Sequence, residues 1–319
     1  MDNGLILSVA QGGQACKVWV CRPTDASLFV AEAEKQVDVL GMEPVTEAAF
    51  DAVTCAVGWL YPLDLLEKFN QIQWVQSTSS GLDHLQAFAR SHPDVVLTAM
   101  RGLNADVVAE YALAQVLGLR WRILTYGRQA QQRVWRGYKV SDAASTTALI
   151  IGMGNIGQRI AGHLSALGMR VLALRRQAAP CAHVDQVLGF GQLHEALAQA
   201  DYVILSLPLT PETRHLIGAA ELAAMKPSGH LINLSRGGIV DEAALAQALH
   251  REDIGGAVLD VTEIEPYPPD GPLWEAPHLL ITPHVAGEHV DFAHRAARRW
   301  AGNLRLFLAR GAAAFQLEG

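Results

Sequence analysis

Apolar residues in the middle of the chain fall into short continuous runs separated by segments with helical spacing. The runs at 148–151 and 171–174 are each long enough for a buried strand. Between them, apolar residues at intervals of four, four and three positions define one face of a helix: Ile156, Ile160, Leu164 and Leu167. Gly168 stands where a glycine commonly ends a helix. The pattern therefore predicts a strand, a turn, a helix and a second strand within 147–176.

The turn in this unit has the spacing Gly-x-Gly-x-x-Gly. Glycine at these positions allows a tight turn, a close backbone approach to a pyrophosphate, and close packing of the helix on the strand. The anion then lies on the free N–H groups of the helix N-terminus. A strand before the turn and a helix after it favour a dinucleotide site over an ordinary turn. The predicted cofactor-binding residues here are Gly152, Gly154, Asn155, Ile156 and Gly157.

The end of the second strand indicates which dinucleotide binds. An NAD site usually has Asp or Glu there, on the ribose 2′-hydroxyl, whereas this chain has Arg175 and Arg176. A carboxylate repels a 2′-phosphate, and a guanidinium binds it through forked, charge-assisted hydrogen bonds. The two arginines therefore favour NADP(H), with NAD(H) still possible. A solvated surface pair is the alternative interpretation.

Beyond residue 200, strand-like runs continue to alternate with helix-like segments. Predicted strands cover 203–207, 231–234, 257–261 and 279–282. One intervening helix covers 241–249, with Asp241 as its N-cap. Such alternation is typical of the α/β class, with a doubly wound parallel sheet that binds ligands beyond the carboxyl ends of its strands.

The first hundred residues predict a smaller α/β unit. Apolar patterns indicate three strands at 5–9, 53–58 and 72–76, and a short amphipathic helix at 63–69. The segment 17–40 has no clear pattern. Small residues over 77–84 present backbone amides that suit a carboxylate, although an ordinary structural turn has the same composition. A long helix over 105–128, capped by Asn104, connects the two units.

Composition bears on the partners of the chain. Half of the residues are hydrophobic and 18% are charged, which predicts well-packed cores. The formal net charge is −7 with no basic block, which argues against nucleic acid as a partner. No apolar run approaches the roughly 20 residues of a membrane span. The first residues also lack the cationic segment of a signal peptide.

Cysteine and histidine usage bears on compartment and metals. The four cysteines are scattered without a Cys-x-x-Cys pair, which favours free thiols in a reducing cytoplasm. The twelve histidines show no recognisable ligand spacing, so no metal site is predicted. His289 and His294 are five positions apart and are expected on a surface helix.

Three residues at the ends of predicted strands could act on a 2-oxo acid: Arg236, Glu265 and His284. When such an acid accepts a hydride, its carboxylate must be held, its carbonyl polarised and its oxygen protonated. The planar fork of an arginine suits the first two tasks, and a histidine with a pKa near 6.5 suits the third. A carboxylate beside the histidine favours the imidazolium. Each residue alone could be an ordinary salt bridge or loop residue, but together they indicate a catalytic site.

Several stretches resemble the D-isomer-specific 2-hydroxyacid dehydrogenases, from about Trp74 to the C-terminus. They are GMGNIG (152–157), LPLTPETRHLI (207–217), MKPSGHLINLSRGGIVDEAAL (225–245), GGAVLDVTEIEPYPPDGPLW (255–274) and ITPHVAG (281–287). The resemblance implies that Arg236 anchors the substrate, Glu265 is the partner of the histidine, and His284 is the general acid/base.

The resemblance also implies further contacts. Asp260 is expected to contact the nicotinamide carboxamide and Val108 to lie near the nicotinamide, while the amides of Ser80 and Gly81 hold the substrate carboxylate. Further cofactor contacts are expected at Leu207, Pro208, Thr213, Leu234, Ser235 and Gly287. Trp59 and Leu60 follow a predicted strand and are expected to cover the substrate pocket.

The fold implied by the resemblance has two Rossmann-like domains with an active-site cleft between them. The substrate-binding, flavodoxin-like domain is expected over 1–101 plus 286–319, and the dinucleotide-binding domain over 102–285. Members are usually homodimers joined through the cofactor domain. Trp135 resembles a tryptophan that reaches the partner's active site in hydroxypyruvate-reductase-like members, although a core or interface position is the commoner case. Glu288 stands where many members have Thr or Ser.

These features predict an NADPH-dependent reductase that converts a small 2-oxo acid, such as glyoxylate or hydroxypyruvate, to the D-2-hydroxy acid. Bulkier 2-oxo acids are an alternative, because the sequence does not reveal the volume of the pocket. An activity like that of formate dehydrogenase is disfavoured, because those enzymes pair the histidine with Gln and this chain has Glu265. A non-catalytic, nucleotide-sensing protein on the same fold is the alternative from another class, and it has no need of the intact Arg, Glu and His set.

Overall fold

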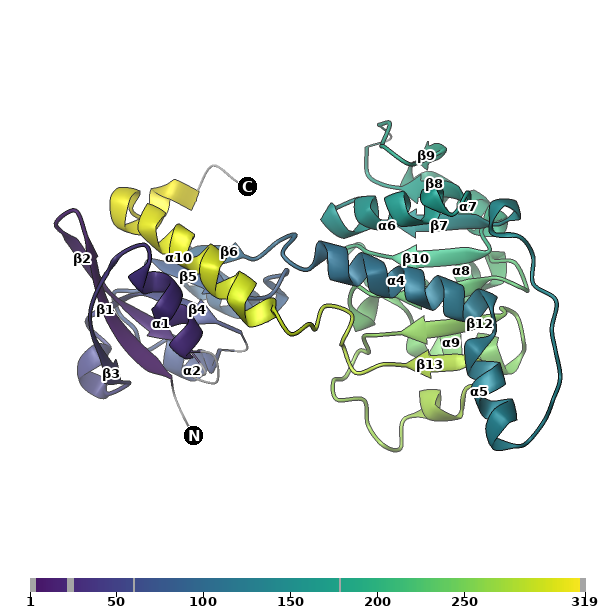
Figure 1. The fold of residues 1–319 in the computed structure, drawn as a ribbon, viewed down its shortest axis with the longest axis horizontal. Helices are drawn as coiled ribbons and strands as arrows, with labels where there is room; N and C mark the ends of the chain where they lie inside the picture. Colours follow the sequence, from purple (N-terminus) through teal and green to yellow (C-terminus); the bar gives the residue numbers. More distant parts are fainter. Residues whose placement is uncertain (1–3, 22–25, 60, 178, 316–319) are drawn as a thin grey trace. The chain divides into compact units, whose positions relative to one another are not determined.

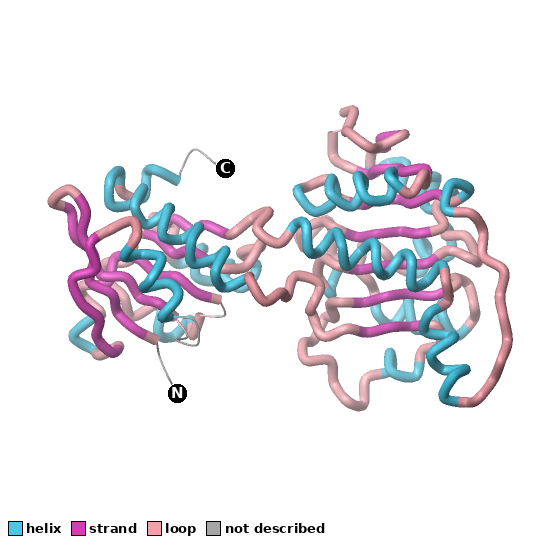
Figure 2. The backbone as a smooth tube through the Cα atoms, viewed as in Figure 1, coloured by secondary structure: helices cyan, strands magenta, loops and turns pink. Residues whose placement is uncertain are grey.

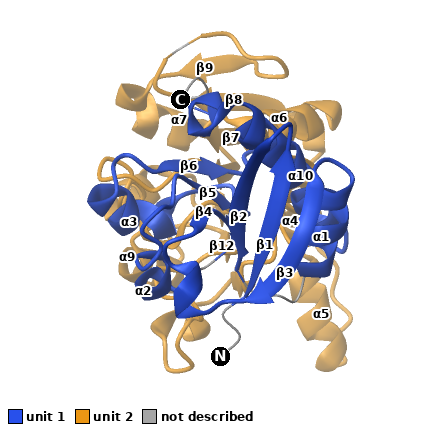
Figure 3. Cartoon of the chain, turned by 90° about the vertical axis from the view of Figure 1, so that its left-hand side faces the viewer, with its two compact units in different colours: residues 1–104, 289–319 blue, residues 105–288 orange. Residues whose placement is uncertain are grey.

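The computed structural model describes residues 4–21, 26–59, 61–177 and 179–315. The chain forms two compact units, coloured separately in Figure 3. Unit 1 comprises residues 1–104 and 289–319, and unit 2 comprises residues 105–288. The C-terminal segment therefore belongs to the same unit as the first hundred residues, and unit 2 is inserted between them.

Unit 2 is built on a seven-stranded sheet in its described part, with the order β13-β12-β11-β10-β7-β8-β9 (Figure 1). All neighbouring strands in it pair in parallel. The strands are β7 (Thr147–Ile151), β8 (Arg170–Leu174), β9 (Gln186–Leu188), β10 (Tyr202–Leu205), β11 (His230–Asn233), β12 (Gly256–Leu259) and β13 (Leu279–Ile281). Strand order reverses between β7 and β10, which is the switch point where such sheets bind ligands.

Helices cover both faces of this sheet because successive strand residues point to opposite faces. In β7, Leu149 and Ile151 contribute to one hydrophobic core, and Ala148 and Ile150 contribute to the other. The first core includes α7 (Leu193–Gln199), α8 (Ala219–Ala224) and α9 (Glu242–His250), and the second includes α4 (Ala105–Arg120) and α6 (Asn155–Ala166). Short 3-10 turns complete the unit at η4 (Ala143–Ser145), η5 (Phe190–Gln192), η6 (Gly237–Ile239) and η7 (Pro272–Glu275).

Several local expectations for unit 2 are confirmed. Strands form at the predicted places with ends shifted by a residue or two. Gly168 follows α6 with a φ of 76°, the left-handed conformation expected of a glycine that ends a helix. The Asp241 side chain accepts a hydrogen bond from the Ala244 amide at 2.9 Å and caps α9.

The expected long helix over 105–128 is wrong. It is divided into α4, which ends at Arg120, and α5 (Ile123–Gln131). Arg122 lies between them with a φ of 53°, a left-handed conformation that interrupts helical hydrogen bonding. Asn104 does not cap α4, because its Oδ1 atom is buried and has no hydrogen-bond partner in the described chain.

Unit 1 contains a six-stranded sheet in its described part, with the order β3-β1-β2-β4-β5-β6. The strands are β1 (Leu5–Gln11), β2 (Gln14–Val20), β3 (Asp38–Pro44), β4 (Val53–Gly58), β5 (Trp74–Ser77) and β6 (Val96–Ala99). β1 pairs antiparallel with β2 and β3, whereas the remaining pairs are parallel. Gly12 and Gly13 have positive φ values and turn the chain between β1 and β2. The segment 17–40, which has no clear sequence pattern, thus contains the end of β2, all of α1 (Ala26–Glu34) and the start of β3.

Helices also cover both faces of the unit 1 sheet (Figure 2). On one face, α1 and α10 (Phe292–Arg310) pack together, and the Phe29 and Trp300 ring centroids are 5.3 Å apart. The other face is covered by α2 (Leu63–Leu66) and α3 (Gln86–Ser91), so the helix expected over 63–69 is shorter than predicted. Its 3-10 turns are η2 (Glu47–Ala49), η3 (Asp83–Leu85) and η8 (Ala312–Phe315). His294 lies on α10 as expected, but His289 precedes that helix.

Among the described residues, the structure contains no helix with the length and apolar character that crossing a membrane requires.

Candidate active site

The three residues expected to carry chemistry lie beyond the carboxyl ends of adjacent strands of unit 2. Arg236 follows β11, Glu265 lies in the loop after β12, and His284 follows β13. Because these strands are parallel neighbours, their carboxyl ends lie along one edge of the sheet. The topology therefore brings together residues that are up to 48 positions apart in the sequence.

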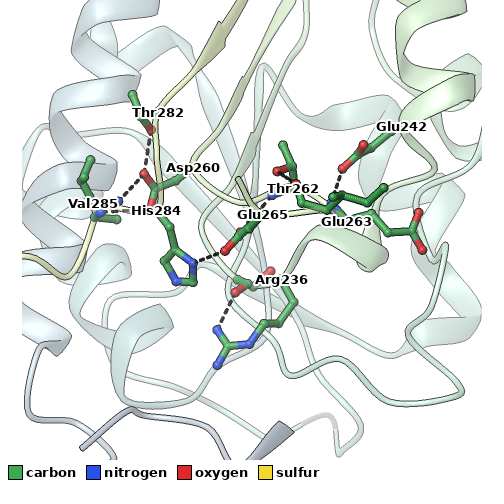
Figure 4. Close-up of polar contacts among 12 residues, drawn as sticks. Arg236, Glu242, Asp260, Thr262, Glu263, Glu265, Thr282, His284 and Val285 are labelled. Atoms are coloured by element: carbon green, nitrogen blue, oxygen red, sulfur yellow. Dashed lines mark hydrogen bonds and ion pairs between the residues drawn. The ribbon is translucent and has the colours of Figure 1, made fainter. Parts of the chain in front are cut away.

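Glu265 and His284 form a hydrogen-bonded pair, with Glu265 Oε2 2.8 Å from His284 Nδ1 (Figure 4). The hydrogen bond with Glu265 raises the pKa of His284 and outweighs burial, which lowers it; the Arg236 charge also opposes the rise. Burial alone would raise the pKa of Glu265, but the hydrogen bond and charge of His284 leave that pKa lowered. The pair is therefore an ionised carboxylate beside an imidazole that readily holds a proton.

Arg236 is held at the site by the turn that follows β11. The fully buried Asn233 donates from Nδ2 to the Arg236 carbonyl at 2.9 Å and accepts from the Ser235 amide at 3.1 Å. Gly237 approaches the neighbouring loop so closely that a Cβ there would lie 2.0 Å from the Thr262 carbonyl carbon. The half-buried Arg236 side chain is close enough for its charge to affect the pKa of both Glu265 and His284.

The loop that carries His284 is organised by Asp260, which is 2% exposed. Its carboxylate accepts hydrogen bonds from the Thr282 hydroxyl at 2.6 Å and from the amides of Val285 and Ala286, both at 2.9 Å (Figure 4). The His284 amide donates to the Asp260 carbonyl at 2.8 Å. These bonds hold His284 at a φ of 54°, a conformation that non-glycine residues seldom adopt and that clusters at functional sites.

Three supporting residues were not found from the sequence. The Tyr111 hydroxyl on α4 lies 2.6 Å from Thr282 Oγ1 and extends the Asp260 network. Glu242 accepts a hydrogen bond from the Glu263 amide at 2.5 Å, and Arg214 pairs with the Glu263 carboxylate at 2.7 Å. These contacts fix the loop that contains Glu265. They join positions far apart in the sequence, so no local pattern could have identified them.

The glycine-rich turn has the geometry that a pyrophosphate requires. Gly152 has a φ of 102°, and a Cβ there would lie 2.4 Å from the Ser206 carbonyl oxygen. A Cβ on Gly157 would lie 2.1 Å from the Gly152 oxygen, so helix and strand pack closely. A Cβ on Gly154, by contrast, would meet no atom within 4 Å. α6 has no side-chain cap and no acidic residue in its first turn, so its N-terminus is suited to an anion.

Arg175 and Arg176 follow β8, on the same edge of the sheet as the glycine-rich turn. Arg175 is half-buried and donates from Nη1 to Cys181 Sγ at 3.0 Å, and Arg176 is exposed. Within the described chain, neither guanidinium forms an ion pair with a carboxylate. The positive charge of both side chains is therefore available to a ligand.

Other expected cofactor contacts also lie at this edge. Leu207 and Pro208 follow β10, Leu234 and Ser235 follow β11, and Gly287 follows the His284 loop. Val108 on α4 is 7% exposed and shares a hydrophobic core with Leu234. Thr213 accepts from the Thr210 amide at 2.7 Å and donates to the Pro208 carbonyl at 2.8 Å, so its hydroxyl shapes the loop after β10.

The loop of small residues after β5 lies in unit 1. The Ser77 hydroxyl donates to Ser79 Oγ at 3.1 Å, and the Ser79 hydroxyl donates to the Gly81 carbonyl. The amides of Ser80 and Gly81 have no acceptor in the part of the chain that the structure describes. Two consecutive amides are thus available to a ligand. Of the residues expected to cover the pocket, Trp59 is 43% exposed, and Leu60 lies outside the described residues.

Two further positions singled out by the sequence are exposed. Trp135 has a relative exposure of 103% in the single chain, and Glu288 is also exposed. Among the described residues, no group of three or more His, Cys, Asp or Glu side chains could hold a metal ion.

Comparisons with known proteins agree with the geometry of this site. Residues 113–286 match the model of the NAD-binding domain of the D-isomer specific 2-hydroxyacid dehydrogenases. A glycerate dehydrogenase of Methylorubrum extorquens is 34% identical over 257 residues, covering 77% of this chain and 79% of that protein. A glyoxylate reductase of Korarchaeum cryptofilum is 32% identical over 262 residues, covering 77% and 76%.

Solved structures are also similar. An NADPH-dependent glyoxylate/hydroxypyruvate reductase from Sinorhizobium meliloti, in complex with NADP and sulfate, aligns with a TM-score of 0.80 and 28% identity, covering 94% of this chain and 96% of that one. A D-isomer specific 2-hydroxyacid dehydrogenase from Xanthobacter autotrophicus, in complex with NADPH and MES, aligns with a TM-score of 0.79 and 28% identity, covering 95% of each chain. The expected α/β fold of two Rossmann-like domains is confirmed.

Proposed function

Because this chain belongs to the D-isomer-specific 2-hydroxyacid dehydrogenase family, we propose that it is an NADPH-dependent reductase that converts a small 2-oxo acid to the D-2-hydroxy acid. The observation that carries the proposal is the 2.8 Å hydrogen bond between Glu265 and His284, with Arg236 beside the pair. All three side chains lie at the edge of the sheet where the glycine-rich turn also lies. A protein that only sensed the nucleotide would not need a proton donor there.

Each of these side chains has a distinct task in the proposed reaction. The nicotinamide supplies the hydride when it is bound. Arg236 holds the substrate carboxylate and polarises the carbonyl oxygen. His284 Nδ1–H donates a hydrogen bond to the Glu265 carboxylate and keeps its proton. The proton on Nε2 is therefore the one transferred to the substrate oxygen. The ionised Glu265 stabilises the imidazolium until that transfer.

The preference for NADP(H) is supported by Arg175 and Arg176, which stand where an NAD site has a carboxylate. NAD(H) remains an acceptable cofactor in this proposal, because the glycine-rich turn recognises the part that both dinucleotides share. The two similar solved structures described above contain NADP or NADPH. Asp260 retains room for a fourth hydrogen bond on its carboxylate, which would serve the nicotinamide carboxamide.

Glyoxylate and hydroxypyruvate are the substrates that we propose first. The relatives named as a glycerate dehydrogenase and a glyoxylate reductase act on small acids of this kind, as their names state. The free amides of Ser80 and Gly81 are suited to a substrate carboxylate, so unit 1 is proposed as the substrate-binding domain. Unit 2 is then the cofactor domain, and a homodimer joined through it is part of the same proposal.

The test is the initial rate of cofactor oxidation with glyoxylate and with hydroxypyruvate, using NADPH and NADH. The variant His284→Asn is preferred to Ala, because Asn tolerates the left-handed backbone at this position. His250→Asn, at an exposed histidine at the end of α9, is the matched control. We expect His284→Asn to lower kcat roughly 100-fold or more and the control to leave it unchanged.

Other outcomes would redirect the proposal. Faster turnover with NADH would contradict the NADPH preference and leave the chemistry intact. Turnover only with bulkier 2-oxo acids would correct the substrate. Tight NADPH binding without turnover of any 2-oxo acid would favour the nucleotide-sensing alternative.

A further inference from the structure

A cavity of about 480 Å³ lies in unit 2 at the edge of the sheet opposite the candidate active site. Its lining includes Tyr202, His230 and Leu279, which are the first residues of β10, β11 and β13. The sheet is parallel, and Arg236, Glu265 and His284 follow the other ends of its strands. The cavity is therefore separate from the catalytic residues. The rest of its lining comes from α4, α5, the segment 138–141 and residues that precede the strands.

The cavity is lined by an excess of positive charge, from Arg120, Arg122, Arg128 and Lys139. Within the described chain, none of these four cations forms an ion pair with a carboxylate. Among the described residues that line the cavity, Asp201 is the one acidic residue, and it already accepts from Lys226 Nζ at 2.8 Å and from the Thr147 amide at 2.8 Å. The charge of the four cations is therefore uncompensated.

The same excess appears in the sequence. The segment 111–141 contains six arginine and lysine residues and no aspartate or glutamate, in a chain whose net charge is −7. The residues are Arg120, Arg122, Arg128, Arg133, Arg136 and Lys139. They are spaced too widely to form a contiguous basic run in the sequence. In the structure, the chain turns between α4 and α5, and four of the six side chains line the same cavity.

Individual groups in the cavity lack partners. Arg120 Nε is buried and makes no hydrogen bond, while its Nη2 donates to the Ser141 carbonyl. The Arg122 guanidinium lies 4.5 Å from the Tyr138 ring centroid, which leaves its in-plane N–H groups available. Burial, and then the Arg122 charge, lower the pKa of His230 to about 4, so its imidazole is neutral near pH 7.

We propose that this cavity binds a small anion with two or more negative charges, presented by phosphate or carboxylate groups. Its volume is within the range of small-molecule sites, roughly 300–1,000 Å³. A multivalent anion would offset several of the four cations at once, whereas a single charge would leave most of them uncompensated. The site is independent of the dehydrogenase reaction, and its occupancy is measurable without turnover.

Isothermal titration calorimetry of the full chain tests the proposal, with inorganic tripolyphosphate and citrate as probes. We expect binding of at least one probe, with one site per chain and an affinity that falls as salt is added. Binding of tripolyphosphate alone would identify a phosphate site, and binding of citrate alone would identify a carboxylate site. If neither probe binds at millimolar concentration in low salt, the proposal is wrong.

A matched pair of variants locates the anion. Arg122 and Arg133 lie on the same segment and both have left-handed φ values, 53° and 56°, but only Arg122 lines the cavity. We expect Arg122→Gln to weaken binding at least tenfold and Arg133→Gln to change it less than twofold. Equal weakening by both variants would indicate a diffuse surface effect and would contradict a defined site.

The phosphate groups of tripolyphosphate could also occupy the proposed cofactor turn. The double variant Arg175→Gln, Arg176→Gln distinguishes the two places, because it leaves the cavity intact. Loss of binding in that variant, with normal binding in Arg122→Gln, would overturn the proposal. As an independent readout, an anion in the cavity should raise the pKa of His230, followed by NMR of its imidazole with His230→Gln to assign the signal.

Discussion

Glu265 Oε2 lies 2.8 Å from His284 Nδ1, and His284 Nε2 has no hydrogen-bond partner in the described chain. One nitrogen of the ring is thus fixed by a carboxylate, and the other is available to a substrate. The raised pKa of His284 means that the proton is held to higher pH than in an isolated histidine. Reduction needs that proton, so its rate should fall as pH rises through the raised pKa, while the reverse oxidation should become faster.

The substitution Glu265→Gln should shift the pH dependence of the rate of reduction toward lower pH. Glutamine can still hydrogen-bond to Nδ1, but it lacks the charge that stabilises the imidazolium. We expect the alkaline limb of the kcat/KM profile for reduction to shift to lower pH, with activity roughly tenfold or more lower above neutrality. Profiles measured in both directions check this. An unshifted profile in the variant would show that Glu265 does not set the pKa of His284.

Asp260→Asn should loosen the loop that carries His284. The Asp260 carboxylate accepts three hydrogen bonds, and an amide has one oxygen and cannot accept them all. We expect a loss of about 1–3 kcal/mol in the free energy of unfolding and a fall in kcat of roughly 10- to 100-fold from misplacement of His284. Denaturant unfolding and steady-state kinetics measure the two effects.

The variant Thr282→Val removes one of the three hydrogen-bond donors to Asp260 and keeps the side-chain volume similar. It should lower the free energy of unfolding and kcat less than Asp260→Asn does. An Asp260→Asn variant with unchanged stability and kcat would contradict the organising role of the carboxylate.

Substitutions of two glycines in the same turn should affect different properties: one should lower stability, and the other should weaken cofactor binding. Gly152→Ala places a methyl group 2.4 Å from a carbonyl oxygen at a φ of 102°, so we expect destabilisation by about 2 kcal/mol or more. Gly154→Ala meets no atom within 4 Å and should leave the melting temperature nearly unchanged. It should instead raise the dissociation constant for NADPH, because the methyl group projects where the pyrophosphate is proposed to lie. Thermal unfolding without cofactor and fluorescence titration with NADPH separate the effects.

The double variant Arg175→Gln, Arg176→Gln tests the choice of dinucleotide. Loss of both guanidinium groups removes charge-assisted bonds to the 2′-phosphate, worth roughly 1.5–3 kcal/mol each. We expect KM for NADPH to rise at least tenfold and KM for NADH to change little. The exposed Arg251, which pairs with Asp253, provides the control variant Arg251→Gln. Equal effects on both cofactors would contradict recognition of the 2′-phosphate.

The sequence predicted unit 2 better than unit 1 for a physical reason. Buried parallel strands such as β7 and β10 are continuous apolar runs, which composition alone reveals. β3 is exposed over nearly its whole length, and it contains a glycine, a glutamate and a proline, so it carries neither a run nor an alternation. The left-handed Arg122 that divides α4 from α5 has no glycine or proline beside it to signal a break.

At the candidate site, the sequence predicted the residue types but not how they are held. Arg236, Glu265 and His284 could be found because each follows a recognisable strand. The bond between Tyr111 and Thr282 joins residues 171 positions apart, and the three hydrogen bonds to Asp260 depend on the path of a loop. Such contacts follow from tertiary structure, which local periodicity does not encode.

The insertion of unit 2 within unit 1 has a consequence for the order in which the chain can fold during synthesis. The core of unit 1 needs Trp300 and Leu304 of α10, which the ribosome adds only after residues 105–288. At roughly 5–20 residues per second, the strands of the first hundred residues wait on the order of ten seconds or more for that helix. Unit 2 is continuous in the sequence and can complete its core in the interval. The nascent N-terminal sheet thus exposes the face that α10 will cover, and it is the part of the chain that most needs protection from aggregation before release.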